Sequence, residues 1–153
     1  MTNLVAQLDR LTNARSVEEL WDVHTKQMGS YGFDRLMYGF TRYRTSSSLG
    51  DPQDWVLLST QSPEYMKVVF DEGLYVHAPM LKWALANDGA CSWRWMMDMN
   101  RIDNLTPSEK RVMDFNREMD VTAGYTVSFR SISERTKGAI ALTAKAGLSQ
   151  DQV

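Results

Sequence analysis

The sequence predicts one α+β domain in which helices cover both faces of an antiparallel sheet. Strand-like segments occur in two pairs, and a polar loop joins the members of each pair, which is the pattern of an antiparallel hairpin. Helical segments precede the first pair and separate it from the second. The 153 residues suffice for one hydrophobic core and for one domain.

The N-terminal part predicts two amphipathic helices. The first spans residues 2–13, where leucines recur at helical spacing. The second spans residues 17–28, because Ser16 and Glu19 form the S-x-x-E pattern of a capping box and Gly29 ends the periodic stretch. His24 lies on the apolar stripe of this helix, so we interpret it as a core or boundary histidine.

The first strand pair follows these helices. Residues 33–43 are rich in aromatic side chains without helical periodicity, and residues 55–60 form a second short apolar run. The loop between them, residues 45–54, contains three serines, Gly50 and Pro52. We therefore expect two neighbouring antiparallel strands.

Three helices are predicted in the middle of the chain. The first spans residues 63–72, and the second runs from Pro79 to about Gly89. The third begins at a capping box that contains Thr106 and Glu109 and continues to about residue 119. Residues 90–104 are dense in Trp and Met and are expected to be irregular.

The second strand pair comprises residues 122–133 and 137–146. Alternation along the first of these strands places successive side chains on opposite faces. A cavity between the sheet and the middle helices would be lined by residues from 36–95 and 124–142. Residues 1–147 are thus one domain, and residues 148–153 resemble the start of a linker.

Composition excludes several classes of protein. A formal net charge of -2 predicts no strongly basic face, so we expect no nucleic-acid binding by this segment alone. Apolar runs stay well below the roughly 20 residues that span a bilayer, and no secretory signal is recognisable. The lone cysteine, Cys91, fits a reducing compartment, so we expect a cytoplasmic protein without a membrane partner.

Common catalytic and metal-binding motifs do not occur in the sequence. Two histidines, His24 and His77, and Cys91 are too few to bind zinc unless carboxylates complete the set. We interpret Cys91 as a small buried thiol, and a Cys91–His77 nucleophile pair is the alternative. We expect no catalytic residue, no metal and no cofactor.

Aromatic side chains gather between Trp55 and Trp95. This stretch holds four of the five tryptophans and also Tyr65, Phe70 and Tyr75. Such density is typical either of an aromatic core or of a pocket for an apolar ligand.

The chain resembles the autoinducer-binding domain of LuxR-type quorum-sensing regulators from about residue 16 to residue 146. The resemblance rests on the order and spacing of five anchors: Gly32-Phe33-Asp34, Pro79, Trp93, Thr106-Pro107 and Gly124. It implies an α-β-α sandwich with an antiparallel sheet of about five strands. It also implies an N-acyl homoserine lactone bound between sheet and helices, a homodimer, and DNA binding through a C-terminal helix-turn-helix domain that this chain lacks.

The resemblance also implies roles for individual positions. Trp93 matches the family tryptophan that hydrogen-bonds the lactone carbonyl, and Gly124 matches a glycine near the pocket. By spacing from Pro79, the family's tyrosine, tryptophan, second tyrosine and aspartate fall on Gln61, Tyr65, Val69 and Ala78. An alanine cannot accept a hydrogen bond from the ligand amide, which would cost about 1–3 kcal/mol if that amide were left unpaired.

We therefore predict a ligand-sensing and dimerisation domain with atypical polar contacts to its ligand. The predicted polar contacts are Trp93, Tyr65, Gln61 and Ser128. The predicted apolar lining is Leu36, Tyr38, Phe40, Trp55, Val69, Phe70 and Trp83. Either the pocket accepts a different signal, or Trp and Met side chains fill it and the domain folds without a ligand.

Two other classes of function remain open from the sequence. One is a ligand-independent fragment that forms heterodimers with full-length LuxR-type regulators and so modulates them. The other is an enzyme that acts on a lactone, for which Cys91 would be the nucleophile.

Overall fold

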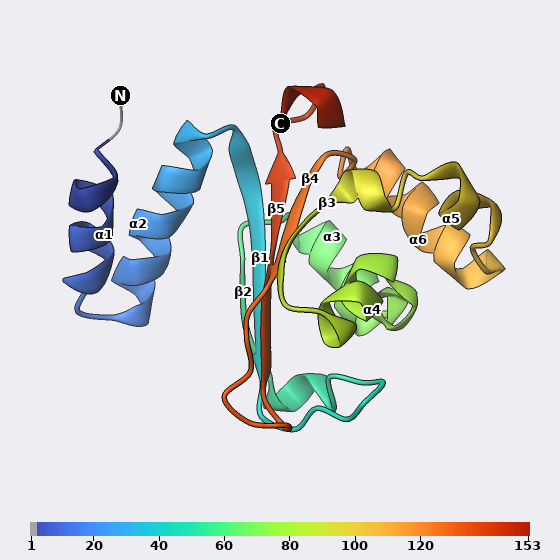
Figure 1. The fold of residues 1–153 in the computed structure, drawn as a ribbon, viewed down its shortest axis with the longest axis horizontal. Coiled ribbons are helices and arrows are strands. Elements are labelled where there is room, and N and C mark those ends of the chain that lie inside the picture. The colour runs from blue at the N-terminus through green and yellow to red at the C-terminus, as the bar shows by residue number, and fades with distance from the viewer. Residues whose placement is uncertain (1–2) are drawn as a thin grey trace.

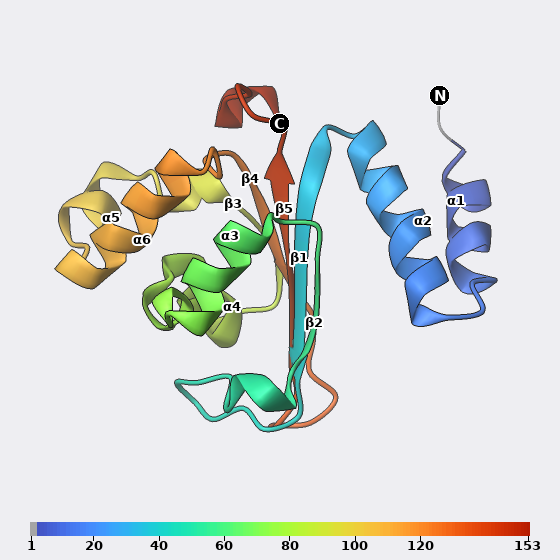
Figure 2. The ribbon, with the colours of Figure 1, turned by 180° about the vertical axis from the view of Figure 1, so that it is seen from behind.

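The computed structural model describes residues 3–153, and side chains are described for all of these except residues 99 and 100. Five strands form one antiparallel sheet in the order β2-β1-β5-β4-β3. Figure 1 shows the sheet edge-on between two helical layers, with α1 and α2 on one face and α3 to α6 on the other. Figure 2 shows the same three layers from behind. The predicted α-β-α sandwich is confirmed.

Helices α1 (Leu4–Thr12) and α2 (Val17–Ser30) form the thinner layer. Asn3 caps α1 by accepting hydrogen bonds from two backbone amides of its first turn. Residue 2, the predicted first residue of this helix, lies outside the described residues. The predicted capping box of α2 is only half formed: Ser16 accepts from the amide of Glu19, but the Glu19 carboxylate bonds the amide of Arg15.

The two central strands β1 and β5 pair over most of their length. Strand β1 (Phe33–Thr41) lies between β2 (Val56–Ser59) and β5 (Lys137–Ala144), and the register along β1 and β5 shifts between Phe33 and Arg35. The guanidinium of Arg35 donates to the carbonyls of Met119, Asp120 and Ala144 at 3.1, 2.8 and 2.7 Å. It therefore ties the segment that directly follows α6 to the sheet.

The thicker layer contains α3 (Pro63–Met66), α4 (Pro79–Ala86), α5 (Met99–Asp103) and α6 (Pro107–Glu118). The predicted helix 63–72 is not one α-helix, because α3 continues as a π-helical turn, η2 (Lys67–Asp71). A 3-10 turn, η3 (Leu74–His77), leads into α4. The predicted capping box of Thr106 and Glu109 at α6 is confirmed.

The prediction that residues 90–104 are irregular is wrong. Gly89–Ser92 form β3, the fifth strand, which pairs with β4 (Gly124–Ser128) at the edge of the sheet. A 3-10 turn, η4 (Trp93–Trp95), and α5 follow. The predicted strand 122–133 is also shorter than expected, since β4 ends at Ser128. The four residues of β3 lack alternation, so their structure comes from pairing with β4.

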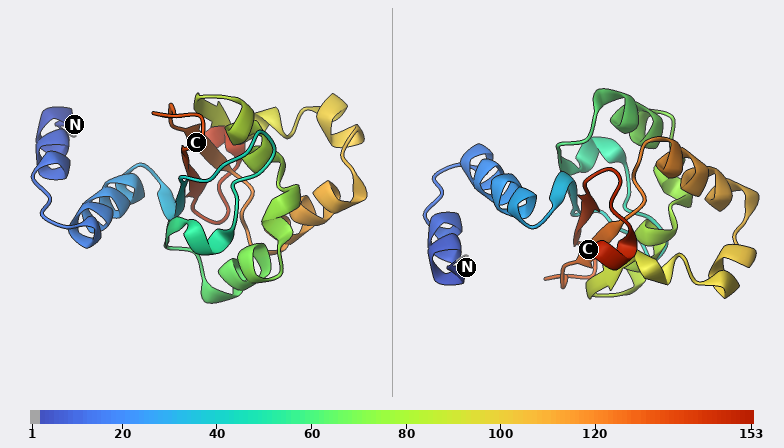
Figure 3. Two further views of the ribbon diagram at one scale, coloured as in Figure 1. Left: turned by 90° about the horizontal axis from the view of Figure 1, so that it is seen from below. Right: turned by 90° about the horizontal axis from the view of Figure 1, so that it is seen from above.

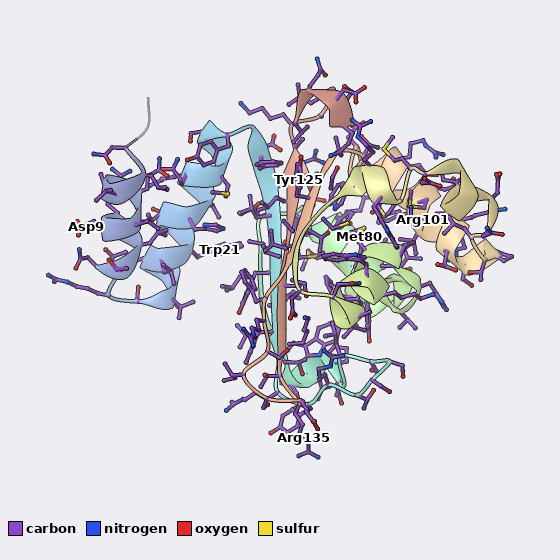
Figure 4. The ribbon with its side chains drawn as sticks, viewed as in Figure 1. Asp9, Trp21, Met80, Arg101, Tyr125 and Arg135 are labelled. Atoms are coloured by element: carbon purple, nitrogen blue, oxygen red, sulfur yellow. The ribbon has the colours of Figure 1, made fainter. Side chains whose placement is uncertain are left out.

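The last turn lies beyond the end of the central strand β5 (Figure 1). Residues 150–152 form a 3-10 turn, η5 (Gln150–Gln152), within the segment predicted to start a linker. Seen along the sheet in Figure 3, α2 lies between β1 and α1, and α1 is the outermost helix on this side. Figure 4 shows Trp21 on the side of α2 that faces the sheet and Met80 on the opposite side of the sheet, within the thicker layer.

Candidate functional site

A cavity of about 360 Å³ lies between the sheet and the thicker helical layer. Strands β1, β4 and β5 form its floor, and α3, η2, α4, η4 and α6 form its walls. Its volume falls within the range typical of small-molecule sites. The aromatic and methionine side chains therefore line a cavity and do not fill it.

Part of the sheet floor consists of small side chains. Gly39 of β1 pairs with Ala139 of β5, and Ala141 of β5 pairs with Thr126 of β4. All four residues line the cavity. Because alternate residues of a strand point to the same face, these pairs lie in adjacent rows on the cavity side. The absence of long side chains on Gly39, Ala139 and Ala141 leaves room above the sheet.

Three rings close one end of the cavity. The ring of Trp55 meets those of Phe70 and Tyr75 edge-on, with centroid distances of 5.9 and 5.1 Å, and Phe70 stacks on Tyr75 at 5.7 Å. The indole N–H of Trp55 donates to the carbonyl of Leu49 at 2.8 Å, which fixes its orientation. This end therefore offers a rigid aromatic surface.

Polar groups in the walls are paired with one another. The indole N–H of Trp93 donates to Thr126 Oγ1 at 2.9 Å, and the hydroxyl of Tyr65 donates to Asn116 Oδ1 at 2.9 Å. Gln61 Nε2 donates to Thr143 Oγ1 at 3.4 Å. These pairs satisfy buried donors without a ligand, so a ligand that bonds one of them must share or replace a partner.

The cavity has two cationic side chains in its described lining, Lys137 and Arg117, and each is paired with a carboxylate. None of the described residues that line it is an Asp, a Glu or a His. The ammonium of Lys137, at one end, bonds Asp88 Oδ1 at 2.9 Å and the carbonyls of Asn87 and Phe129. Burial raises the pKa of Tyr65 to about 12, with partial opposition from the charge of Arg35. The tyrosine hydroxyl therefore stays protonated at neutral pH.

Sequence-predicted residues divide into two groups. Those that line the cavity are Trp93, Tyr65, Gln61, Val69, Ala78, Trp55, Phe40 and Phe70. Those that do not line it are Leu36, Tyr38, Trp83, Gly124 and Ser128.

The second group has identifiable places in the fold. Leu36 and Tyr38 alternate with Met37, Gly39 and Thr41, which line the cavity, so they point to the α2 face, where Tyr38 meets the ring of Phe129. Trp83 packs against the buried cluster that contains Trp93, and Ser128 donates to the carbonyl of Ala84 at 2.7 Å.

Sequence reasoning did not name several lining residues. Four of them lie in predicted strands: Thr126, Ala139, Ala141 and Thr143. Alternation along these strands could have indicated that they face the cavity. Asn116 of α6 also lines the cavity. It lies four residues after Val112, on the same helix face, and that spacing could have revealed it.

Reactive groups do not converge on the cavity. Cys91 is half-buried and packs against the aromatic cluster, whereas His77 is exposed. Burial raises the pKa of the Cys91 thiol, with partial opposition from Arg101, so the neutral thiol is favoured. Within residues 3–153, no group of three or more His, Cys, Asp or Glu side chains could hold a metal ion. No helix in the described part of the chain is long and apolar enough to cross a membrane.

Three solved structures share this fold. They are the N-acylhomoserine lactone-dependent LuxR family transcription factor CepR2 from Burkholderia cenocepacia (TM-score 0.70, 16% identity), SdiA from Escherichia coli (0.71, 13%) and the VqsR ligand-binding domain from Pseudomonas aeruginosa (0.62, 12%). The matches cover 95%, 95% and 97% of this chain and 78%, 56% and 83% of those chains. The chain thus spans little more than half of the SdiA chain.

A search of curated protein sequences gave no significant match. The sequence profile of the autoinducer-binding domain family, in contrast, matches residues 16–153, which is most of the chain. That family comprises signal-binding domains of regulators and is not an enzyme family. The chain belongs to the autoinducer-binding domain family of LuxR-type quorum-sensing regulators.

Proposed function

We propose that this chain is the ligand-sensing and dimerisation domain of a LuxR-type transcriptional regulator, which acts in the cytoplasm. Its ligand is an N-acyl homoserine lactone or a related small apolar signal. The observation that carries the proposal is the cavity of about 360 Å³, whose floor and walls are mainly apolar. DNA binding belongs to a C-terminal helix-turn-helix domain of the full-length regulator.

Two features of the cavity support a ligand with one apolar and one polar part. The ring cluster of Trp55, Phe70 and Tyr75 provides an apolar end. Trp93, Tyr65 and Gln61 provide hydrogen-bonding groups elsewhere in the wall. Ala78 lines the cavity at the position where the family resemblance implies an aspartate. The contacts to an acyl lactone amide would therefore differ from the family pattern.

Thermal unfolding with a panel of acyl homoserine lactones and bacterial extracts tests the ligand proposal. A compound that binds only the folded state raises Tm by mass action, by an amount that grows with its concentration. Ala141→Leu places extra methyl groups in the cavity and should abolish the shift. Ala90→Leu is the matched control, because Ala90 is an exposed residue of β3 and should leave the shift intact.

Two outcomes contradict this proposal. One is that no lactone and no extract changes Tm. The other is that a shift persists at full size in Ala141→Leu, since the compound would then bind elsewhere.

Dimerisation is supported by apolar side chains on the outer helices. Leu4, Leu8, Val17 and Leu20 are between 42% and 62% exposed. They belong to two neighbouring helices, and a contiguous exposed apolar patch is typical of an interaction surface. We expect a second copy of the chain to cover them. Sedimentation should give twice the mass of 17.5 kDa, and Leu8→Glu with Leu20→Glu should give monomers.

The same exposed face favours a second candidate function, a fragment that forms heterodimers with full-length LuxR-type regulators. Co-expression with a LuxR-type partner distinguishes the two functions. Exclusive recovery of mixed dimers, with no ligand-dependent Tm shift, supports the fragment. Self-association together with such a shift supports the sensor.

A further inference from the structure

The C-terminal turn η5 contacts both sequence neighbours of Trp93. Gln150 is only 7% exposed, and its Nε2 donates to Ser92 Oγ at 2.9 Å. Asp151 forms an ion pair with Arg94. Ser92 in turn accepts from the amide of Arg94 at 3.2 Å and so caps the turn that carries Trp93. Two residues of η5 therefore bond the segment on either side of the indole.

Gln150 also binds the backbone that lies against the indole ring. Its Oε1 accepts from the amide of Gly124 at 2.8 Å, and its Nε2 donates to the carbonyl of Gly124 at 3.1 Å. A Cβ at Gly124 would lie 3.1 Å from Cζ3 of Trp93. Because Gly124 has no side chain, only its backbone lies between the side-chain amide of Gln150 and the indole ring.

Trp93 is held from the cavity side as well. It is 5% exposed and lines the cavity, and its N–H bonds Thr126 of the neighbouring strand. The indole is therefore fixed between two sets of contacts, Thr126 on one side and Gln150, through Ser92 and Gly124, on the other. A change in one set of contacts therefore changes the indole position at which the other set can form.

We propose that Gln150 is a positioning residue for Trp93, and that η5 consequently responds to whatever contacts Trp93 in the cavity. The positioning role holds whether or not the cavity takes a ligand. The response to a bound signal rests on the proposed function. Because coupling between two sites is reciprocal, weakening the Gln150 contacts must loosen Trp93, and weakening the Trp93–Thr126 bond must loosen η5.

Hydrogen exchange of the indole N–H protons tests the positioning role without any ligand. In Gln150→Ala, the Trp93 indole proton should exchange at least about tenfold faster, as expected when local opening becomes easier by roughly one hydrogen bond. The Trp55 indole proton, which bonds Leu49, serves as an internal reference in the same molecule and should not change. A purely structural role for Gln150 would accelerate both protons equally, and that result would overturn the proposal.

Variants within η5 sharpen this test. Gln152→Ala is the matched control, because the Gln152 side chain accepts from the amide of Ser149 at 2.8 Å, a bond local to this turn, and it should leave Trp93 exchange unchanged. Gln150→Glu keeps an acceptor for Gly124 but loses both donated bonds, so its effect should be intermediate. If Gln150→Ala does not fold, Ser92→Ala removes one of the Gln150 contacts and must still accelerate Trp93 selectively.

The reciprocal experiment starts from the cavity. Thr126→Val removes the acceptor of the Trp93 N–H, and it should accelerate exchange of the Gly124 amide proton, which bonds Gln150. Thr126→Ser keeps the hydroxyl and should not. Equal Gly124 exchange in the two variants would show that η5 does not respond to the indole and would refute the coupling.

Discussion

The indole N–H of Trp93 and the hydroxyl of Thr126 form a buried hydrogen bond of 2.9 Å in the wall of the cavity. This bond joins η4, which follows the edge strand, to β4. The tryptophan is therefore oriented before any ligand arrives. A ligand carbonyl that accepts from this indole competes with Thr126, so part of its binding free energy is offset by the bond that it replaces.

Thr126→Val should destabilise the protein by about 1–3 kcal/mol, because it leaves a buried indole donor without a partner. Thr126→Ser keeps the acceptor and should cost less. Urea unfolding of the two variants measures the difference in the free energy of unfolding. Equal stability of the two variants would show that the hydroxyl of Thr126 is not needed.

Gly124→Ala should lower the free energy of unfolding by more than about 2 kcal/mol, because forced overlap in a packed site is costly. A Cβ there would lie 2.0 Å from the carbonyl oxygen of Leu142, which belongs to the backbone and cannot turn aside. Gly29→Ala is the opposite case: its Cβ meets nothing within 4 Å and it lies in α2. That variant should gain about 0.5–1 kcal/mol in urea unfolding. An unchanged free energy of unfolding in Gly124→Ala would contradict the close approach of Leu142 to Gly124.

Arg35→Lys should destabilise the protein by about 2 kcal/mol, because an ammonium cannot reproduce the guanidinium geometry that bonds three carbonyls. Arg117→Lys is the control, since Arg117 is exposed and bonds Asp114 within the same helix. It should change stability by less than about 0.5 kcal/mol. Chemical unfolding followed by circular dichroism compares them, and similar losses would refute the special role of Arg35.

Tyr65 should make the protein less stable in alkali. Its pKa is raised by burial to about 12 in the folded state, against an ordinary value of 10.0. The unfolded chain loses this proton first, so stability is full below pH 10 and declines as pH rises toward 12, by about 1 kcal/mol at pH 11.

Tyr65→Phe isolates this contribution. The variant should be less stable than the wild type at pH 8, where it lacks the bond to Asn116. The difference in the free energy of unfolding between the wild type and Tyr65→Phe should narrow between pH 10 and pH 11. Tyr43→Phe, with an exposed ring, should follow the wild-type curve. A gap that is constant with pH would contradict the shifted pKa.

The sequence was most informative where structure is set locally. The cap at Thr106, the proline at the start of α4 and the alternation along β4 each act within a few residues. Edge strand β3 has no such signal, because Gly89–Ser92 are small residues whose conformation depends on β4, more than thirty positions away in the chain. The break of the predicted helix 63–72 into α3 and a π-helical turn was likewise not visible as a periodic pattern.

The site was predictable as a region but not as a set of contacts. Trp93, Tyr65 and Trp55 do line one cavity, as the aromatic density between positions 55 and 95 suggested. Their partners Thr126 and Asn116 come from distant elements, and no local spacing connects them. The face of Leu36 and Tyr38 depended on the register shift near Phe33, which only the pairing with β5 defines.

The small side chains of the sheet floor limit the length of a bound molecule, whereas other residues recognise its polar groups. Gly39, Ala139 and Ala141 carry no hydrogen-bonding side-chain group, while Trp93, Tyr65 and Gln61 bond Thr126, Asn116 and Thr143 and none of these three small residues. Single methyl groups added at the floor therefore shorten the cavity in small steps and leave the donors in place. Mutations in the strands can therefore change the size of molecule that such a cavity accepts. The hydrogen-bonding groups in its walls stay the same.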